Sequence, residues 1–197
     1  MAVTTLVALG IALVPIVLVT RDGDTPSPSP GTPGIGVVAT DLRIVPEVSV
    51  EKRKAYAAAL KTVLHGLYTG AFTAEAATDV PSPSPASSEL DAFLTVAAQK
   101  AIRANPEVFS AGEDLTVTQG RVEFAGVVTL DGSRGIAALV TVDFTGTASP
   151  VGESSPTARV RQTGTIELRR ADDGAWLVSG FDVKLTSEPA PTPTPRS

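Results

Sequence analysis

Apolar and polar residues follow three different patterns along this chain of 197 residues. The first pattern is an unbroken apolar run from Ala2 to Val19, in which Thr4 and Thr5 are the polar side chains. A helix of this length reaches roughly 27 Å, close to the thickness of about 30 Å of a membrane hydrocarbon core. We therefore expect residues 1–21 to form a single transmembrane helix that contacts the lipid bilayer through residues 2–20. A cleaved signal peptide is disfavoured, because no Lys or Arg precedes the run and no small-x-small cleavage site follows it.

The second pattern is helical and begins after Pro46, where apolar residues recur every three or four positions. Ser49 is the expected N-cap, with Glu51 in the first turn, and Gly70 is the expected end. Residues 71–79 are expected to add a short helix anchored by Phe72. The apolar stripe of the long helix consists of Val50, Tyr56, Leu60, Val63, Leu64, Leu67 and Tyr68.

A further helix is predicted after the proline-rich residues 81–87, which form a loop. Ser88 to Asp91 is a variant of the capping box, and the Asn105-Pro106 pair ends the helix, because a residue before proline avoids the helical conformation. The buried stripe of this uninterrupted helix consists of Leu90, Phe93, Leu94, Ala97, Ala101 and Ile102.

The third pattern starts at Leu115, where the apolar period shortens to two. It predicts four strands with short connections, which favour an antiparallel meander, at residues 115–130, 136–148, 158–170 and 176–185. In the last strand Leu177 shares a face with Phe181, Val183 and Leu185, whereas Trp176 and Val178 lie on the face of Asp182 and Lys184. The expected fold class is α+β, with two to three helices on the apolar face of a four-stranded antiparallel sheet.

Proline-rich segments divide the chain. Residues 22–38 are expected to form a Pro/Ser/Thr-rich tether in an extended polyproline conformation, followed by the domain at 39–187 and a disordered tail at 188–197. The tether is interpreted as a plain disordered linker or as an O-glycosylated stalk. The presence of this tether favours an extracytoplasmic domain, with the N-terminus inside and the C-terminus outside.

The composition limits the kinds of partner, metal site and redox site that this chain can have. The net charge of −5 is spread thinly without a basic patch, so a nucleic-acid partner is not expected. The absence of cysteine excludes disulfides, iron–sulfur clusters and thiolate zinc sites. We expect no metal and no cofactor. The abundance of Ala, Val and Thr, with eleven Arg against five Lys, is typical of an actinobacterial genome.

The final strand contains a motif that resembles a known family. Its pattern is G-x-W-x-V-x-x-F-x-V, formed by Gly174, Trp176, Val178, Phe181 and Val183. With a single span, helices and a strand meander before it, this pattern resembles the actinobacterial Mce-associated membrane proteins. The resemblance implies an extracytoplasmic, cone-like domain of the nuclear transport factor 2 (SnoaL-like) superfamily, and an accessory or assembly role. The inner-membrane scaffold component of type IV secretion systems has a similar layout.

Candidate site residues follow from two hypotheses. If the cone binds a small molecule, as in the ketosteroid isomerases of that superfamily, Tyr56, Tyr68 and Asp143 are the candidate ligand-binding residues, although alternation places Asp143 on the outer face with Thr141 and Thr145. If the domain binds proteins, Trp176 is a candidate anchor, and a row of arginines could meet an acidic surface. That row contains Arg159, Arg161, Arg169 and Arg170.

Other polar residues have ordinary structural interpretations. His65 is interpreted as a partly exposed helical histidine, and Asp182 as an outer-face residue beside Lys184. No catalytic residue is assigned, and we do not expect an enzyme. The sequence therefore predicts a membrane-anchored, non-catalytic envelope domain that acts on envelope proteins as an accessory, scaffold or interaction factor. A small-molecule-binding or isomerase-like cone domain and a secretion-system scaffold are the alternatives, and the oligomeric state is left open.

Overall fold

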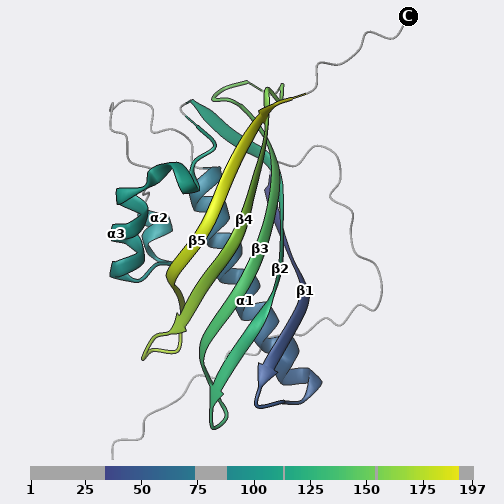
Figure 1. The fold of residues 1–197 in the computed structure, drawn as a ribbon, viewed down its shortest axis with the longest axis vertical. Coiled ribbons are helices and arrows are strands. Elements are labelled where there is room, and N and C mark those ends of the chain that lie inside the picture. Colours follow the sequence, from purple (N-terminus) through teal and green to yellow (C-terminus); the bar gives the residue numbers. More distant parts are fainter. Residues whose placement is uncertain (1–33, 74–87, 113, 154, 191–197) are drawn as a thin grey trace, which may run out of the picture. The chain divides into compact units, whose positions relative to one another are not determined.

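The computed structural model describes residues 34–73, 88–112, 114–153 and 155–190 (Figure 1). The predicted span at residues 1–21, most of the tether, the loop at 81–87 and most of the tail lie outside these residues, as does most of the short helix expected at 71–79. None of the helices in the described part of the chain is long and apolar enough to cross a membrane.

The described domain is α+β, but its sheet differs from the predicted one. Its five strands are β1 (Gly34–Val45), β2 (Leu115–Asp131), β3 (Arg134–Pro150), β4 (Ala158–Arg170) and β5 (Trp176–Pro189), and they lie side by side in this order. Strands β2 to β5 form the expected antiparallel meander, whereas β1 pairs with β2 in parallel. The prediction of a four-stranded antiparallel sheet was therefore wrong, because the sheet is five-stranded and mixed.

Strand β1 was not predicted, because its first residues resemble a linker and its alternation of buried and exposed residues is interrupted. Gly34 directly follows a proline-rich stretch, so residues 34–38 were assigned to the tether. A β-bulge between Ala39 and Asp41 leaves Thr40 as an extra residue, whose hydroxyl donates to the Phe124 carbonyl at 3.0 Å. A bulge reverses the parity of the strand, so its buried residues do not keep a period of two. They are Ile35, Leu42 and Ile44.

Helix α1 (Val50–Phe72) begins as predicted and ends later. The Ser49 hydroxyl accepts from the Lys52 amide at 3.4 Å, which confirms the N-cap. The expected end at Gly70 was wrong, since the helix continues to Phe72 and is capped at Thr73. A Cβ on Gly70 would lie 3.4 Å from Leu90, so this glycine admits a neighbouring segment instead of ending the helix.

The predicted helix after residue 88 is broken into α2 (Ser88–Asp91) and α3 (Val96–Ala104). Between them Leu94 forms a parallel bridge with Val178 of β5. The Val178 amide donates to the Phe93 carbonyl, and the Thr95 amide donates to the Val178 carbonyl, both at 2.9 Å. Main-chain hydrogen bonds to a distant strand therefore replace helical ones, and the Thr95 hydroxyl caps α3 anew. The end of the helix at Asn105 is confirmed, and a 3₁₀ turn, η1 (Pro106–Phe109), follows it.

The predicted faces of β5 were wrong for the residues before a bulge in that strand. Glu167 pairs with Gly180 and Leu168 with Val178, so Ser179 is an extra residue. Trp176 and Val178 therefore lie in the core before the bulge, although alternation placed them opposite the apolar set. After the bulge, the residues packed against the core are Phe181, Val183 and Leu185, as predicted.

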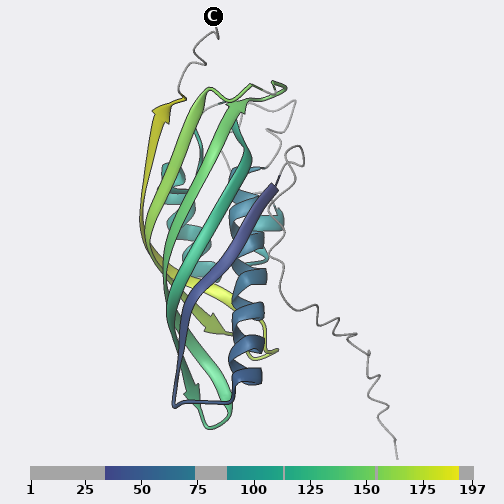
Figure 2. The same cartoon turned by 90° about the vertical axis from the view of Figure 1, so that its right-hand side faces the viewer.

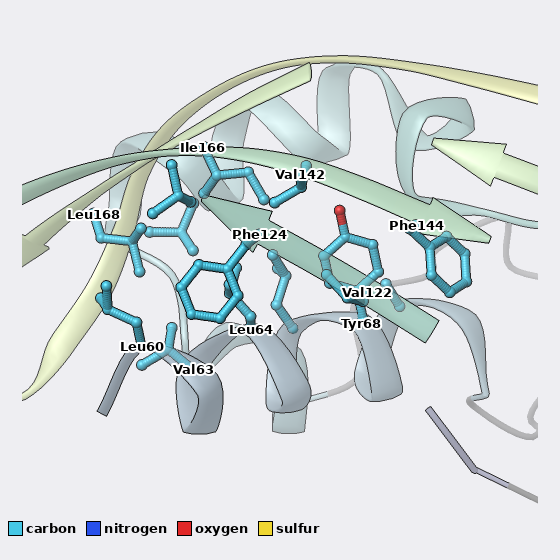
Figure 3. Packing of buried hydrophobic residues seen from close by; sticks show 14 of the residues in the cluster. Leu60, Val63, Leu64, Tyr68, Val122, Phe124, Val142, Phe144, Ile166 and Leu168 are labelled. Atoms are coloured by element: carbon cyan, nitrogen blue, oxygen red, sulfur yellow. The ribbon is translucent and has the colours of Figure 1, made fainter. Parts of the chain in front are cut away.

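Helix α1 packs across one face of the sheet, called here the inner face, and α2 and α3 lie beside β5 (Figure 1). Figure 2 shows α1 alongside the inner face and no described element on the opposite, outer face. Figure 3 shows the side chains that fill the interface between α1 and the sheet. Fully buried residues of this core include Leu60, Leu64, Leu67, Tyr68, Val122, Phe124, Phe144, Ile166 and Leu168. The interior is therefore a packed apolar core.

Candidate functional site

The three residues proposed to line a pocket lie in three different environments. Tyr68 is fully buried, and its hydroxyl donates to Gln162 Oε1 at 2.6 Å, while Gln162 Nε2 donates to the Val108 carbonyl. Burial, with a smaller contribution from the negative charge of Asp143, raises the pKa of the Tyr68 phenol well above its usual value. The Tyr68 ring also packs against Phe72, Phe109 and Phe144. This tyrosine therefore ties α1, β4 and η1 together.

Tyr56 lies nearer the start of α1, beside the β2–β3 hairpin. Its hydroxyl donates to the Ser133 carbonyl at 3.3 Å and accepts from the Gly135 amide at 2.8 Å. Tyr56 and Tyr68 are separated by twelve helical positions, or about 18 Å along the helix axis. The two phenols therefore do not share a site.

Asp143 lies on the outer face, as its alternation with Thr141 and Thr145 indicated. Its two carboxylate oxygens accept from Arg161 Nε at 3.1 Å and Nη2 at 2.6 Å. This bidentate pair raises the pKa of the Arg161 guanidinium, mainly through the hydrogen bonds. Asp143 and Arg161 thus meet each other, whereas Asp143 meets neither tyrosine. Arg159 is exposed on the same face.

Trp176 does not present an exposed anchor. Only 7% of it is exposed, and its ring meets Tyr56 edge-on at a centroid distance of 6.4 Å. His65 is exposed, and its Nδ1 lies 2.9 Å from the carbonyl oxygen of Ile35, so it binds the main chain of β1. Asp182 is exposed on the outer face opposite Thr165.

Two shallow hollows lie where the first turns of α1 meet the strand connections. One, of about 270 Å³, is lined by residues 46–49, Lys52 and the β2–β3 turn. The other, of about 320 Å³, is lined by Lys52, Tyr56, Ser133, Arg170 and Trp176, among others. Lys52 and Ser133 line both hollows, and the two together are called here the α1 groove. In the second hollow both charged residues are cations. Within the described residues, no cluster of histidine or acidic side chains could hold a metal ion.

The outer face carries an apolar patch that sequence analysis did not single out. Val127 and Leu139 are paired across β2 and β3, with 37% and 52% of each residue exposed. Ile136, the extra residue of a bulge in β3, and Val45 at the end of β1 are exposed nearby. We call Val45, Val127, Ile136 and Leu139 the outer-face patch. The pairing of Val127 with Leu139 could have been predicted from the sequence, since the Asp131–Gly135 hairpin loop sets the register between β2 and β3.

The chain was compared with protein families, with curated proteins and with solved structures. No protein-family model, no curated protein and no solved structure matches this chain.

Proposed function

We propose that this domain is a non-catalytic protein-interaction module of the cell envelope, acting as an accessory or scaffold factor. The observation that carries the proposal is the packed interior beneath a partly apolar outer face that no element among the described residues covers (Figure 2). Leucine, valine and phenylalanine fill the space between α1 and the sheet, where a cone-shaped enzyme would hold its substrate. Tyr56, Tyr68 and Asp143, which would have to converge, each bind a different partner.

The outer face supplies the interaction surface. Large exposed apolar side chains that gather on one face are typical of sites that bind another protein. Four of the exposed large apolar residues belong to the outer-face patch. Charged side chains lie on both sides of it, Arg43 beside Val127 and Glu167 beside Leu139, and both are exposed. An apolar centre with a polar surround is the usual composition of a protein interface.

Attachment to a membrane is part of the proposal and rests on the sequence. The apolar residues 2–20 and the proline-rich stretch after them would hold the domain near a bilayer, on its extracytoplasmic side. The resemblance of the closing strand to the Mce-associated proteins supports an assembly role there. A domain placed in this way would bind envelope proteins that diffuse in the same membrane.

Site-specific photo-crosslinking in the native membrane tests the proposal. A benzophenone amino acid is introduced at Leu139 in the outer-face patch, and the matched control is the same amino acid at Lys61, which is exposed on α1. We expect adducts of defined mass from position 139 that are missing from position 61. Equal adduct patterns from both positions, or none from position 139, would contradict a specific interaction through the outer face.

A second candidate function, binding of a small anion, is favoured by the α1 groove. Lys52 and Arg170 are the charged residues of its second hollow, and Trp176, the single tryptophan of the chain, lines it. Binding there would change the tryptophan fluorescence, and benzoate and inorganic phosphate are suitable probes. A saturable change that is lost in Lys52→Met but kept in Lys61→Met would support this candidate, and a linear, unsaturated response would oppose it.

A further inference from the structure

One row of the sheet has a symmetric distribution of charge around an apolar centre. Reading across the outer face from β1 to β4, the paired residues are Arg43, Val127, Leu139 and Glu167. The two middle residues are the centre of the outer-face patch, and all four are exposed. A cation therefore flanks the apolar pair on one side and an anion flanks it on the other.

The two flanking charges are free to pair with another molecule. Neither Arg43 nor Glu167 forms an ion pair within the described residues, whereas Arg121 and Asp143, farther along the same face, bind Glu123 and Arg161. The Glu167 side chain leans toward Gly180 of β5, because a Cβ on Gly180 would lie 3.3 Å from its carboxylate oxygen. This orientation leaves Leu139 uncovered.

A two-fold axis makes this row complementary to itself. If the axis runs parallel to the strands, midway between β2 and β3, it places Arg43 of each copy over Glu167 of the other. The same rotation places Val127 over Leu139, so apolar meets apolar at the centre. Adjacent strands are about 4.8 Å apart, so Arg43 and Glu167 lie about 7 Å to either side of the axis when measured in the plane of the sheet. Both contacts then form twice, as a two-fold interface requires.

The adjacent row toward the centre of the sheet permits such an approach. It places Ala125 over Thr141 of the other copy, and both side chains are small. Face-to-face sheets pack about 10 Å apart with their strands nearly aligned, which is the arrangement that the axis generates.

We propose that the outer-face patch binds a second copy of this chain, sheet against sheet, with Arg43 of each copy paired to Glu167 of the other. The inference rests on the proposed function as an interaction module and names its partner. Homodimers are the commonest protein assemblies, and opposite charges at the rim of an interface select one register of docking.

Crosslinking between two single-cysteine variants tests the geometry, because the chain has no cysteine of its own. Full-length Arg43→Cys and Glu167→Cys chains with different tags are placed in the same membrane and treated with a bismaleimide that spans about 10 Å. The axis puts positions 43 and 167 of opposite copies about 10 Å apart, but two copies of either position roughly 17 Å apart. We expect a crosslink between the two variants and far less within either one. Crosslinks of equal yield within one variant, or none at all, would overturn the inference.

Charge reversal tests the pairing in the full-length chain in detergent. Arg43→Glu and Glu167→Arg should each weaken self-association about tenfold, since two pairs are lost and replaced by repulsion. The double variant should restore it to near the original value, and Lys61→Glu should leave it unchanged. A double variant as weak as the two single variants would overturn the inference. A photo-adduct at Leu139 that contains a different protein and never the chain itself would also overturn it while leaving the proposed function intact, whereas no adduct would refute both.

Discussion

The buried contact between Tyr68 and Gln162 gives a prediction that can be worked through quantitatively. Both residues are fully buried, and Gln162 connects the phenol to the Val108 carbonyl. A buried polar group that loses its partner destabilises the protein by about 1–3 kcal/mol. Tyr68→Phe leaves one such group, the Gln162 oxygen, and should lower the free energy of unfolding by about 1.5 kcal/mol. Gln162→Leu leaves two, the phenol and the Val108 carbonyl, and should lower it by about 3 kcal/mol.

The double variant distinguishes this network from two separate effects. With both changes, the Val108 carbonyl is the remaining unpaired group, so the loss should be about 1.5 kcal/mol instead of the sum of about 4.5 kcal/mol. Urea unfolding followed by circular dichroism measures the three values. Thr62→Ala is the control, because it removes an exposed hydroxyl that bonds within α1 at 3.1 Å, and it should cost less than about 0.5 kcal/mol. Additive losses in the double variant would refute the reasoning.

The same phenol predicts a dependence on pH. The unfolded chain releases the tyrosine proton near pH 10, whereas burial raises the pKa of folded Tyr68, so the folded state keeps its proton. Stability from this group is therefore complete below about pH 10 and falls as the pH rises above it, by up to about 1.4 kcal/mol per pH unit. The urea midpoint of the unaltered chain should fall more steeply above pH 10 than that of Tyr68→Phe. Parallel curves would show that Tyr68 contributes nothing to the slope.

Three further outcomes can be checked. A Cβ on Gly66 would overlap the Phe93 ring, so Gly66→Ala should destabilise the domain by about 2 kcal/mol in thermal or urea unfolding. In a Phe93→Ala background the same change should stabilise the domain by up to about 1 kcal/mol, and destabilisation in both backgrounds would contradict this. Ser49→Ala removes the cap of α1 and should lower the free energy of unfolding by about 0.5–1 kcal/mol. An unchanged free energy of unfolding would show that the 3.4 Å contact does not stabilise the helix. Protease added to intact protoplasts should digest the domain, and a protected domain would show that the proposed orientation is wrong.

Features that depend on nearby residues were predictable from the sequence. The N-cap at Ser49, the helix end at Asn105 and the hairpin loops after Asp131 and Asp172 each arise from a few neighbouring residues. The meander from β2 to β5 follows from them, because short connections leave neighbouring strands few alternatives. The outward position of Asp143 followed in the same way from simple alternation.

The errors share a cause, which is pairing between distant parts of the chain. Leu94 leaves its helix because β5 supplies a partner more than eighty positions later, and Ser179 shifts the face of Trp176 only in the context of that strand's register. Strand β1 similarly needs β2. The candidate pocket failed for a related reason, since the distance between Tyr56 and Tyr68 along one helix was known, but the packed core between them was not.

The parallel pairing of β1 has a consequence for how the chain folds. Val37 pairs with Val122, 85 positions later, so β1 leaves the ribosome long before its partner exists. At synthesis rates of about 5–20 residues per second, the delay is roughly 4–17 s. Strands β2 to β5 can pair one after another as hairpins, which form quickly because their loops are short. The first strand to be made therefore has to wait for its partner, and until it docks, Ile35, Leu42 and Ile44 stay exposed to chaperones and to other nascent chains.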